Sequence, residues 1–178
     1  MTTWVALLRG VNVGGITVRS ADLAALFRDL GFAEVTTVLA SGNVRFETDA
    51  AASGRRSLKA AIETGLRERF GYDAWIVLVT RDELTAAVEA FPFDADDSGR
   101  QPYVIFSSDD AVADELATAA ASLDDHDLDP VTRGDGVVYW NPPKGMTLHT
   151  PFAKVLGKKT YKSSTTNRNL RTLLKILA

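Results

Sequence analysis

The chain has 178 residues, of which 46% are hydrophobic and 24% are charged, and its formal net charge is −3. This composition suits one compact domain or two small ones and excludes wholesale disorder. The absence of cysteine excludes disulfides, thiolate metal sites and cysteine nucleophiles. No apolar run reaches the roughly 18 residues of a membrane span, and the N-terminus lacks a signal-peptide pattern. We therefore expect a cytoplasmic protein with no membrane partner.

The charges are unevenly distributed. Residues 1–81 hold ten Lys or Arg and eight Asp or Glu, residues 82–135 hold two and fifteen, and residues 136–178 hold eight and none. A basic end of this kind is typical of a segment that binds a polyanion. It is equally compatible with a basic end that folds against the acidic middle, or with a surface that serves solubility alone.

Residues 1–81 predict the order β-α-β-β-α-β, which is that of the split-βαβ or ferredoxin-like motif. The helices are indicated by apolar residues at helical spacing and by Gly31 and Gly71 as their C-terminal stops. Alternation and turn residues indicate the strands. In chain order, the expected elements are a strand at 4–9, a helix with Ser20 as N-cap, strands at 35–39 and 44–46, a helix over 58–70, and a strand at 75–79.

Residues 82–101 are expected to connect this half to a second one. Thr80 and Glu83 have the spacing of a capping box, which predicts a helix after the first half, and an acidic linker follows. Residues 102–178 repeat the order of elements and end in a basic helix. The expected elements are a strand at 103–106, a helix over 112–123, strands at 129–133 and 137–140, a short helix after Thr150, and a last helix from about Asn167.

The predicted fold class is therefore α+β, with two ferredoxin-like halves of antiparallel sheet and a C-terminal helix. The strand at 4–9 is apolar on both of its faces, whereas helices can cover only one face of a split-βαβ sheet. The other face needs a cover. That cover is the second sheet, the C-terminal segment or another copy of the chain, so monomer and homodimer both remain open.

The predicted topology brings two loops to one end of the first sheet. The loop after the strand at 4–9 and the turn at 40–43 should meet there, with Arg9 as a cation that can pair with an oxyanion. Glycines let backbone N–H groups approach a ligand, and a helix N-terminus nearby favours anions. The same residues also suit two purely structural turns. The anion-site hypothesis comprises Arg9, Asn12, Gly14, Gly15, Ser41, Gly42 and Asn43.

The basic C-terminal segment supports a second hypothesis, in which the protein binds nucleic acid through counterion release. The split-βαβ fold is also the scaffold of RNA-recognition domains, although residues 43–47 lack their aromatic pattern. A third hypothesis is a protein-interaction module whose loops are structural only. The candidate nucleic-acid or phosphate contacts are Lys158, Lys159, Lys162, Arg168 and Arg171.

Metal and cofactor chemistry finds no support in the sequence. The chain has two histidines, His126 and His149, and they do not form a pair with zinc-ligand spacing. No catalytic motif is present, so we expect no metal or cofactor, and the sequence does not identify a reaction.

The run Val-Ala-Leu-Leu-Arg-Gly-Val-Asn-Val-Gly-Gly at residues 5–15, followed by Ser-Gly-Asn-Val at 41–44, resembles the bacterial family called domain of unknown function 1697. The resemblance extends to residues 138–140 and 166–169 and so covers nearly the whole chain. It implies an α+β fold of two ferredoxin-like halves and no established activity. It also implies a site at the two loops, whose residues match the family motif one by one.

Overall fold

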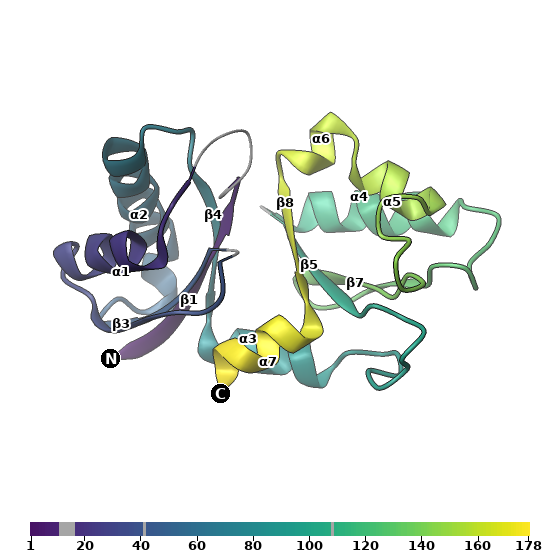
Figure 1. Cartoon of the computed structure of the whole chain (residues 1–178), viewed down its shortest axis with the longest axis horizontal. Helices are drawn as coiled ribbons and strands as arrows, with labels where there is room; N and C mark the ends of the chain where they lie inside the picture. Colours follow the sequence, from purple (N-terminus) through teal and green to yellow (C-terminus); the bar gives the residue numbers. More distant parts are fainter. Residues whose placement is uncertain (11–16, 41, 108) are drawn as a thin grey trace. The chain divides into compact units, whose positions relative to one another are not determined.

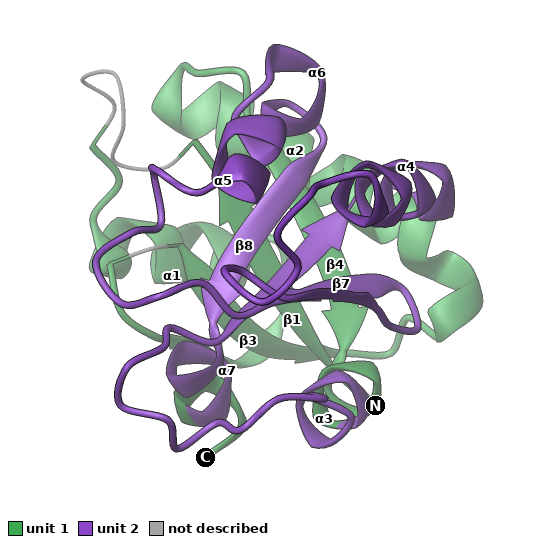
Figure 2. Cartoon of the chain, turned by 90° about the vertical axis from the view of Figure 1, so that its right-hand side faces the viewer, with its two compact units in different colours: residues 1–85, 175–178 green, residues 86–174 purple. Residues whose placement is uncertain are grey.

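The computed structural model describes residues 1–10, 17–40, 42–107 and 109–178, which form two compact units (Figures 1 and 2). One unit comprises Met1–Thr85 with Lys175–Ala178, and the other comprises Ala86–Leu174. In the described part of the chain, each unit has one four-stranded antiparallel sheet with the same strand order. The predicted α+β fold of two ferredoxin-like halves is thus confirmed.

The sheet of the first unit has the order β2-β3-β1-β4, with β1 paired antiparallel to both β3 and β4. Helices α1 and α2 cover one face of this sheet (Figure 1). The elements are β1 (Thr2–Arg9), α1 (Ser20–Asp29), β2 (Ala33–Thr37), β3 (Asn43–Thr48), a 3-10 turn (Ala52–Gly54), α2 (Arg55–Phe70), β4 (Trp75–Thr80) and α3 (Arg81–Glu89), the last of which runs across the boundary between the units.

Strand β1 is buried on both faces, as its sequence predicts. Trp4, Ala6 and Leu8 pack in the core beneath α1 and α2, while Val5 and Leu7, which point to the opposite face, are also fully buried. Strand β1 is therefore a central strand whose side chains are buried on both faces of the sheet.

The C-terminal residues belong to the first unit because two arginines hold them there. The Arg45 guanidinium donates to the carbonyl oxygens of Ile176 and Ala178, at N···O distances of 2.7 and 2.8 Å. Arg81 donates to the carbonyl of Leu177 at 3.1 Å. The last carbonyls of a helix lack partners within it, so cationic donors stabilise them. Since Arg45 alternates with core residues on β3, the C-terminal segment lies on the sheet face opposite α1 and α2.

Helix α3 begins with the capping box that the sequence predicts. The Thr80 hydroxyl accepts the amide N–H of Glu83, and the Glu83 carboxylate accepts the amide N–H of Thr80. Glu83 also forms an ion pair with Arg55 at 2.5 Å. These contacts join the end of β4, the start of α3 and the first turn of α2.

Helix α1 begins differently from the prediction. Arg19 occupies the N-cap position without a side-chain cap, and Ser20 is already the first helical residue. Val18 and Leu23, on either side of the N-cap, are both buried in the core. Their spacing is that of a hydrophobic staple, so packing rather than a serine cap sets this helix start.

The stability of the first unit is expected to depend on pH through Glu83. Burial alone would raise the pKa of its carboxyl. Hydrogen bonds from Arg55 and Thr80 and the positive charge of Arg55 outweigh burial, so the pKa of Glu83 lies below its ordinary value of 4.5. The stabilisation is therefore present above the ordinary pKa and is lost as pH falls through the lowered one.

Replacement of Glu83 by glutamine should lower the free energy of unfolding by about 0.5–1 kcal/mol at neutral pH, because a cap and a partly exposed ion pair are lost. Thermal unfolding between pH 7 and 3 should show the wild type and Glu83→Gln converging in acid. The exposed Glu68→Gln variant is the control. If the stability difference between the wild type and Glu83→Gln stays constant across this pH range, the pH dependence is not due to Glu83.

The sheet of the second unit has the order β6-β7-β5-β8. Its core gathers Ile105, Leu116, Val138, Trp140 and Phe152, which come from β5, α4, β7 and α5. The elements are β5 (Tyr103–Ser107), α4 (Asp110–Ala121), β6 (Val131–Arg133), β7 (Val137–Trp140), α5 (Pro151–Leu156), α6 (Lys159–Lys162), β8 (Thr165–Asn169) and α7 (Leu170–Leu177), the last of which runs into the first unit.

Strand β8 corrects the sequence prediction, in which a helix begins at about Asn167. Residues Thr165–Asn169 pair with β5 along its whole length, and α7 starts only at Leu170. The segment is polar and lacks strand alternation, but it supplies hydrogen-bond partners to one side of β5. Long-range pairing therefore overrides the local pattern.

Within the described residues, no helix has the length and apolar composition needed to cross a membrane.

Candidate functional site

The end of β1 and the β2–β3 connection lie side by side. The amide of Leu8 donates to the carbonyl of Gly42 at 2.8 Å, and Leu7 pairs with Asn43 in the register of β1 and β3. Arg9 and Gly10 thus leave the sheet next to Gly42, at the edge where the sequence places the anion site. The other members of the predicted site, Asn12, Gly14, Gly15 and Ser41, lie outside the described residues.

Both bends need glycine for their backbone conformation. Gly10 and Gly42 each have φ of +77°, in the left-handed region that side chains with a Cβ disfavour. A Cβ built at Gly10 would meet nothing within 4 Å, so glycine is required there by backbone conformation and not by crowding.

The variant Gly10→Ala is therefore expected to lower the free energy of unfolding by about 1–2 kcal/mol, the penalty of a left-handed residue with a Cβ. Gly54→Ala is the matched control, because Gly54 has φ of −88° and room for a methyl group. Urea unfolding of both variants measures the difference. Equal stability of the two variants would show that the bend at Gly10 is not held in this conformation.

Arg9 is partly buried at the end of β1, and no carboxylate among the described residues compensates its charge. Its Nε is buried and has no hydrogen-bond partner, and within the described residues the guanidinium forms no ion pair with a carboxylate. Burial lowers the pKa of the Arg9 guanidinium below its ordinary value. Arg9 Nε is therefore a cationic N–H donor beside two glycine bends, and it has no acceptor in the part of the chain that the structure describes.

Asn43 has a structural role at this edge. Its side chain is only 1% exposed and donates from Nδ2 to the carbonyl of Val38 at 2.8 Å, while the Val38 amide donates to the Asn43 carbonyl at 2.9 Å. These two hydrogen bonds close the β2–β3 connection. The Asn43 amide therefore braces the loop from inside.

Leu39, which the sequence analysis did not single out, lies in the same connection with φ of +59° and its side chain about half exposed. An apolar residue in the left-handed region is unusual and marks local strain. No composition or spacing signal in the sequence predicts this conformation.

The basic residues of the C-terminal segment do not form one surface group. Lys158, Lys159, Lys162 and Arg171 are exposed. Arg168 is only 7% exposed on β8, and its Nη1 donates to the Thr166 hydroxyl and the Asn167 carbonyl at 2.6 and 3.0 Å.

Metal ligands are not grouped in the part of the chain that the structure describes, where no three His, Cys, Asp or Glu side chains are placed to hold one ion. His126 and His149 are both exposed.

Comparison with known proteins gives the fold and the family. The structure of the conserved bacterial protein SP0830 from Streptococcus pneumoniae matches with a TM-score of 0.81 and 23% sequence identity, covering 99% of this chain and 97% of that one. At this identity the likeness shows the fold alone. No protein of curated function matches the chain significantly. The family described as protein of unknown function (DUF1697) matches residues 1–139. The chain therefore belongs to this DUF1697 family.

Proposed function

We propose that this is a cytoplasmic protein that binds a phosphorylated or otherwise anionic small molecule at the edge formed by Arg9, Gly10 and Gly42. The observation that carries the proposal is the buried Nε of Arg9. Among the described residues, this Nε has no hydrogen-bond partner, and the guanidinium forms no ion pair with a carboxylate. A guanidinium matches the oxygens of phosphate and carboxylate groups in geometry and charge.

Energetics support a ligand at this position. A buried donor without an acceptor destabilises a fold by about 1–3 kcal/mol, and partial burial of the charge adds to that. An anion oxygen bound at Arg9 Nε would offset both the unpaired donor and the partial burial of the positive charge. Asn12, Gly14, Gly15 and Ser41 are proposed as further members of the site and lie outside the described residues.

Thermal unfolding in inorganic phosphate and pyrophosphate, against chloride at equal ionic strength, tests the proposal. The melting temperature of the wild type should rise with anion concentration by several degrees, because a ligand that binds only the folded state stabilises it. Arg9→Gln should lose this rise, and the exposed Arg56→Gln variant should retain it. An equal rise in Arg9→Gln, or no rise in the wild type with either anion, would contradict the proposal.

Nucleic-acid binding is a second candidate, favoured by the exposure of the lysines around α5 and α6. Lys154, Lys158, Lys159 and Lys162 are all exposed, and within the described residues none forms an ion pair. Four cations close in sequence can contact a phosphate backbone without base recognition. The buried Arg168 is not part of this group.

If these lysines bind nucleic acid, the affinity for a single-stranded oligonucleotide should fall steeply with salt, with a log–log slope of about 0.7 per phosphate contact. The triple variant with glutamine at Lys158, Lys159 and Lys162 should lower that slope, and Lys144→Gln serves as the control. Fluorescence polarisation measures both. An undetectable complex at low salt would eliminate this candidate.

A further inference from the structure

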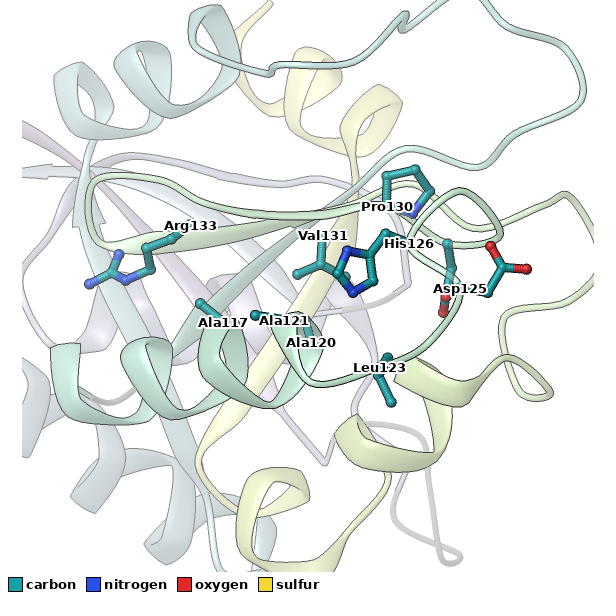
Figure 3. A pocket seen from close by; sticks show the side chains of 10 residues that line it. Ala117, Ala120, Ala121, Leu123, Asp125, His126, Pro130, Val131 and Arg133 are labelled. Carbon is teal, nitrogen blue, oxygen red and sulfur yellow. The ribbon is translucent and has the colours of Figure 1, made fainter.

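The second unit contains a pocket of about 330 Å³ between α4, β6 and the connection that joins them (Figure 3). This volume is at the lower end of the range of small-molecule sites in proteins. The wall is largely apolar and is built on the last turns of α4. Its apolar members are Ala117, Ala120, Ala121, Leu123, Pro130 and Val131.

Asp129 lines this pocket and is only 3% exposed. One carboxylate oxygen, Oδ2, accepts the amide N–H of Phe152 at 3.2 Å and the indole N–H of Trp140 at 3.4 Å. The other oxygen, Oδ1, is buried and has no hydrogen-bond partner among the residues that the structure describes. Among the described residues, only Oδ2 of Asp129 accepts hydrogen bonds and Oδ1 accepts none, which is rare for a buried carboxylate.

The cation nearest in sequence does not compensate Asp129. Arg133 also lines the pocket, but its guanidinium forms ion pairs with Asp114 and Asp110 at 3.0 and 3.4 Å and donates to the carbonyl of Val137. In Figure 3 this guanidinium points away from the other labelled side chains. Within the described residues, Asp129 has no ion-pair partner.

The charge around the pocket favours a cation. Asp125 lies at the end remote from Arg133, beside His126 (Figure 3). The connection is held by backbone donors to Asp125 and by Arg100, which donates to the carbonyls of Asp127 and Leu128. The carboxylates exceed the free cations here, so the local field attracts positive charge.

We propose that this pocket binds a small molecule with a cationic N–H donor, an amine or amidine, on a flat apolar body. The donor would take Asp129 Oδ1, and the body would lie against the alanines of α4. This site is independent of the anion site at Arg9 and selects the opposite charge. The juxtaposition that supports the proposal is an apolar pocket wall together with a lining residue, Asp129, that has one carboxylate oxygen without a hydrogen-bond partner among the described residues.

Titration with benzamidine, followed by ¹H–¹⁵N NMR of the whole chain, tests the proposal. Benzyl alcohol and benzoate are the neutral and anionic comparisons. Benzamidine should shift the amides of Ala117, Ala120 and Val131 and the indole N–H of Trp140, which reports directly on Asp129. It should bind at least about tenfold more tightly than either comparison, because a charged hydrogen bond is involved.

Two variants complete the test. Ala117→Leu should fill the pocket and weaken benzamidine binding at least about tenfold, whereas Ala111→Leu, exposed on the same helix and outside the pocket, should not. Asp129→Asn should also weaken benzamidine binding at least about tenfold, because the carboxylate charge is lost. The proposal is overturned if benzamidine shifts no pocket resonance up to its solubility limit, if benzyl alcohol binds as tightly, or if Ala117→Leu binds as the wild type does.

Discussion

Replacement of Arg9 by methionine is expected to weaken the binding of inorganic pyrophosphate at least about tenfold, without lowering the free energy of unfolding in anion-free buffer. The loss of affinity follows because Arg9 supplies the cation of the proposed site. The stability is retained because Arg9 Nε contributes no hydrogen bond to the fold, and a methionine of similar length avoids a buried unpaired donor.

This combination separates the proposal from the hypothesis that the loops are structural only. If Arg9 braces the loops, Arg9→Met should lower stability by about 1–3 kcal/mol, and anions should have no effect on the wild type. Calorimetry with pyrophosphate and urea unfolding measure the two quantities separately. Arg9→Lys should have intermediate affinity, because lysine keeps the charge but loses the planar set of donors.

The variant Asp129→Ala is expected to lower the free energy of unfolding by about 2–4 kcal/mol. Removal of the Asp129 carboxylate leaves the buried indole N–H of Trp140 and the amide N–H of Phe152 without an acceptor. Each unpaired buried donor lowers the free energy of unfolding by about 1–3 kcal/mol. Trp140 is a central residue of the second core, so its displacement would loosen β7 and α5 together.

Asp129→Asn should stay within about 1 kcal/mol of the wild type, or exceed it, because the amide oxygen can replace Oδ2 while the uncompensated charge disappears. Urea unfolding of both variants measures this difference. A fold that tolerates asparagine at this position does not itself need the charge, which fits a carboxylate kept for a ligand. An asparagine variant as unstable as the alanine variant would instead make the charge part of the fold.

Local signals were sufficient to predict most of the fold. The spacing of apolar residues predicts the main helices, and the turn around Gly136 joins β6 and β7 with a left-handed glycine. The Thr80–Glu83 capping box is a reciprocal pair of local hydrogen bonds and is therefore visible in sequence. The order β-α-β-β-α-β then leaves few topologies, and the ferredoxin-like one is observed twice.

Features that depend on distant contacts could not be predicted. Strand β8 is polar, and its pairing with β5 decides its conformation. Asn43 resembles a surface turn residue in sequence but is buried as a brace. Asp129 lies in an acidic stretch where nothing distinguishes it from its neighbours, and only the positions of Trp140 and Phe152 make it a buried acceptor. In the proposed anion site, topology predicts that the end of β1 and Gly42 meet, but the buried Arg9 Nε without a partner among the described residues is visible only in three dimensions.

The most direct measurement of the central claim is NMR observation of the arginine Nε–H resonances during a titration with inorganic pyrophosphate. We expect the Arg9 Nε–H, assigned by its absence in Arg9→Gln, to shift and to gain protection from exchange with water as an anion oxygen becomes its acceptor. The Arg56 resonance should stay in place. An Arg9 resonance that responds no more than that of Arg56 would contradict an anion site at the end of β1.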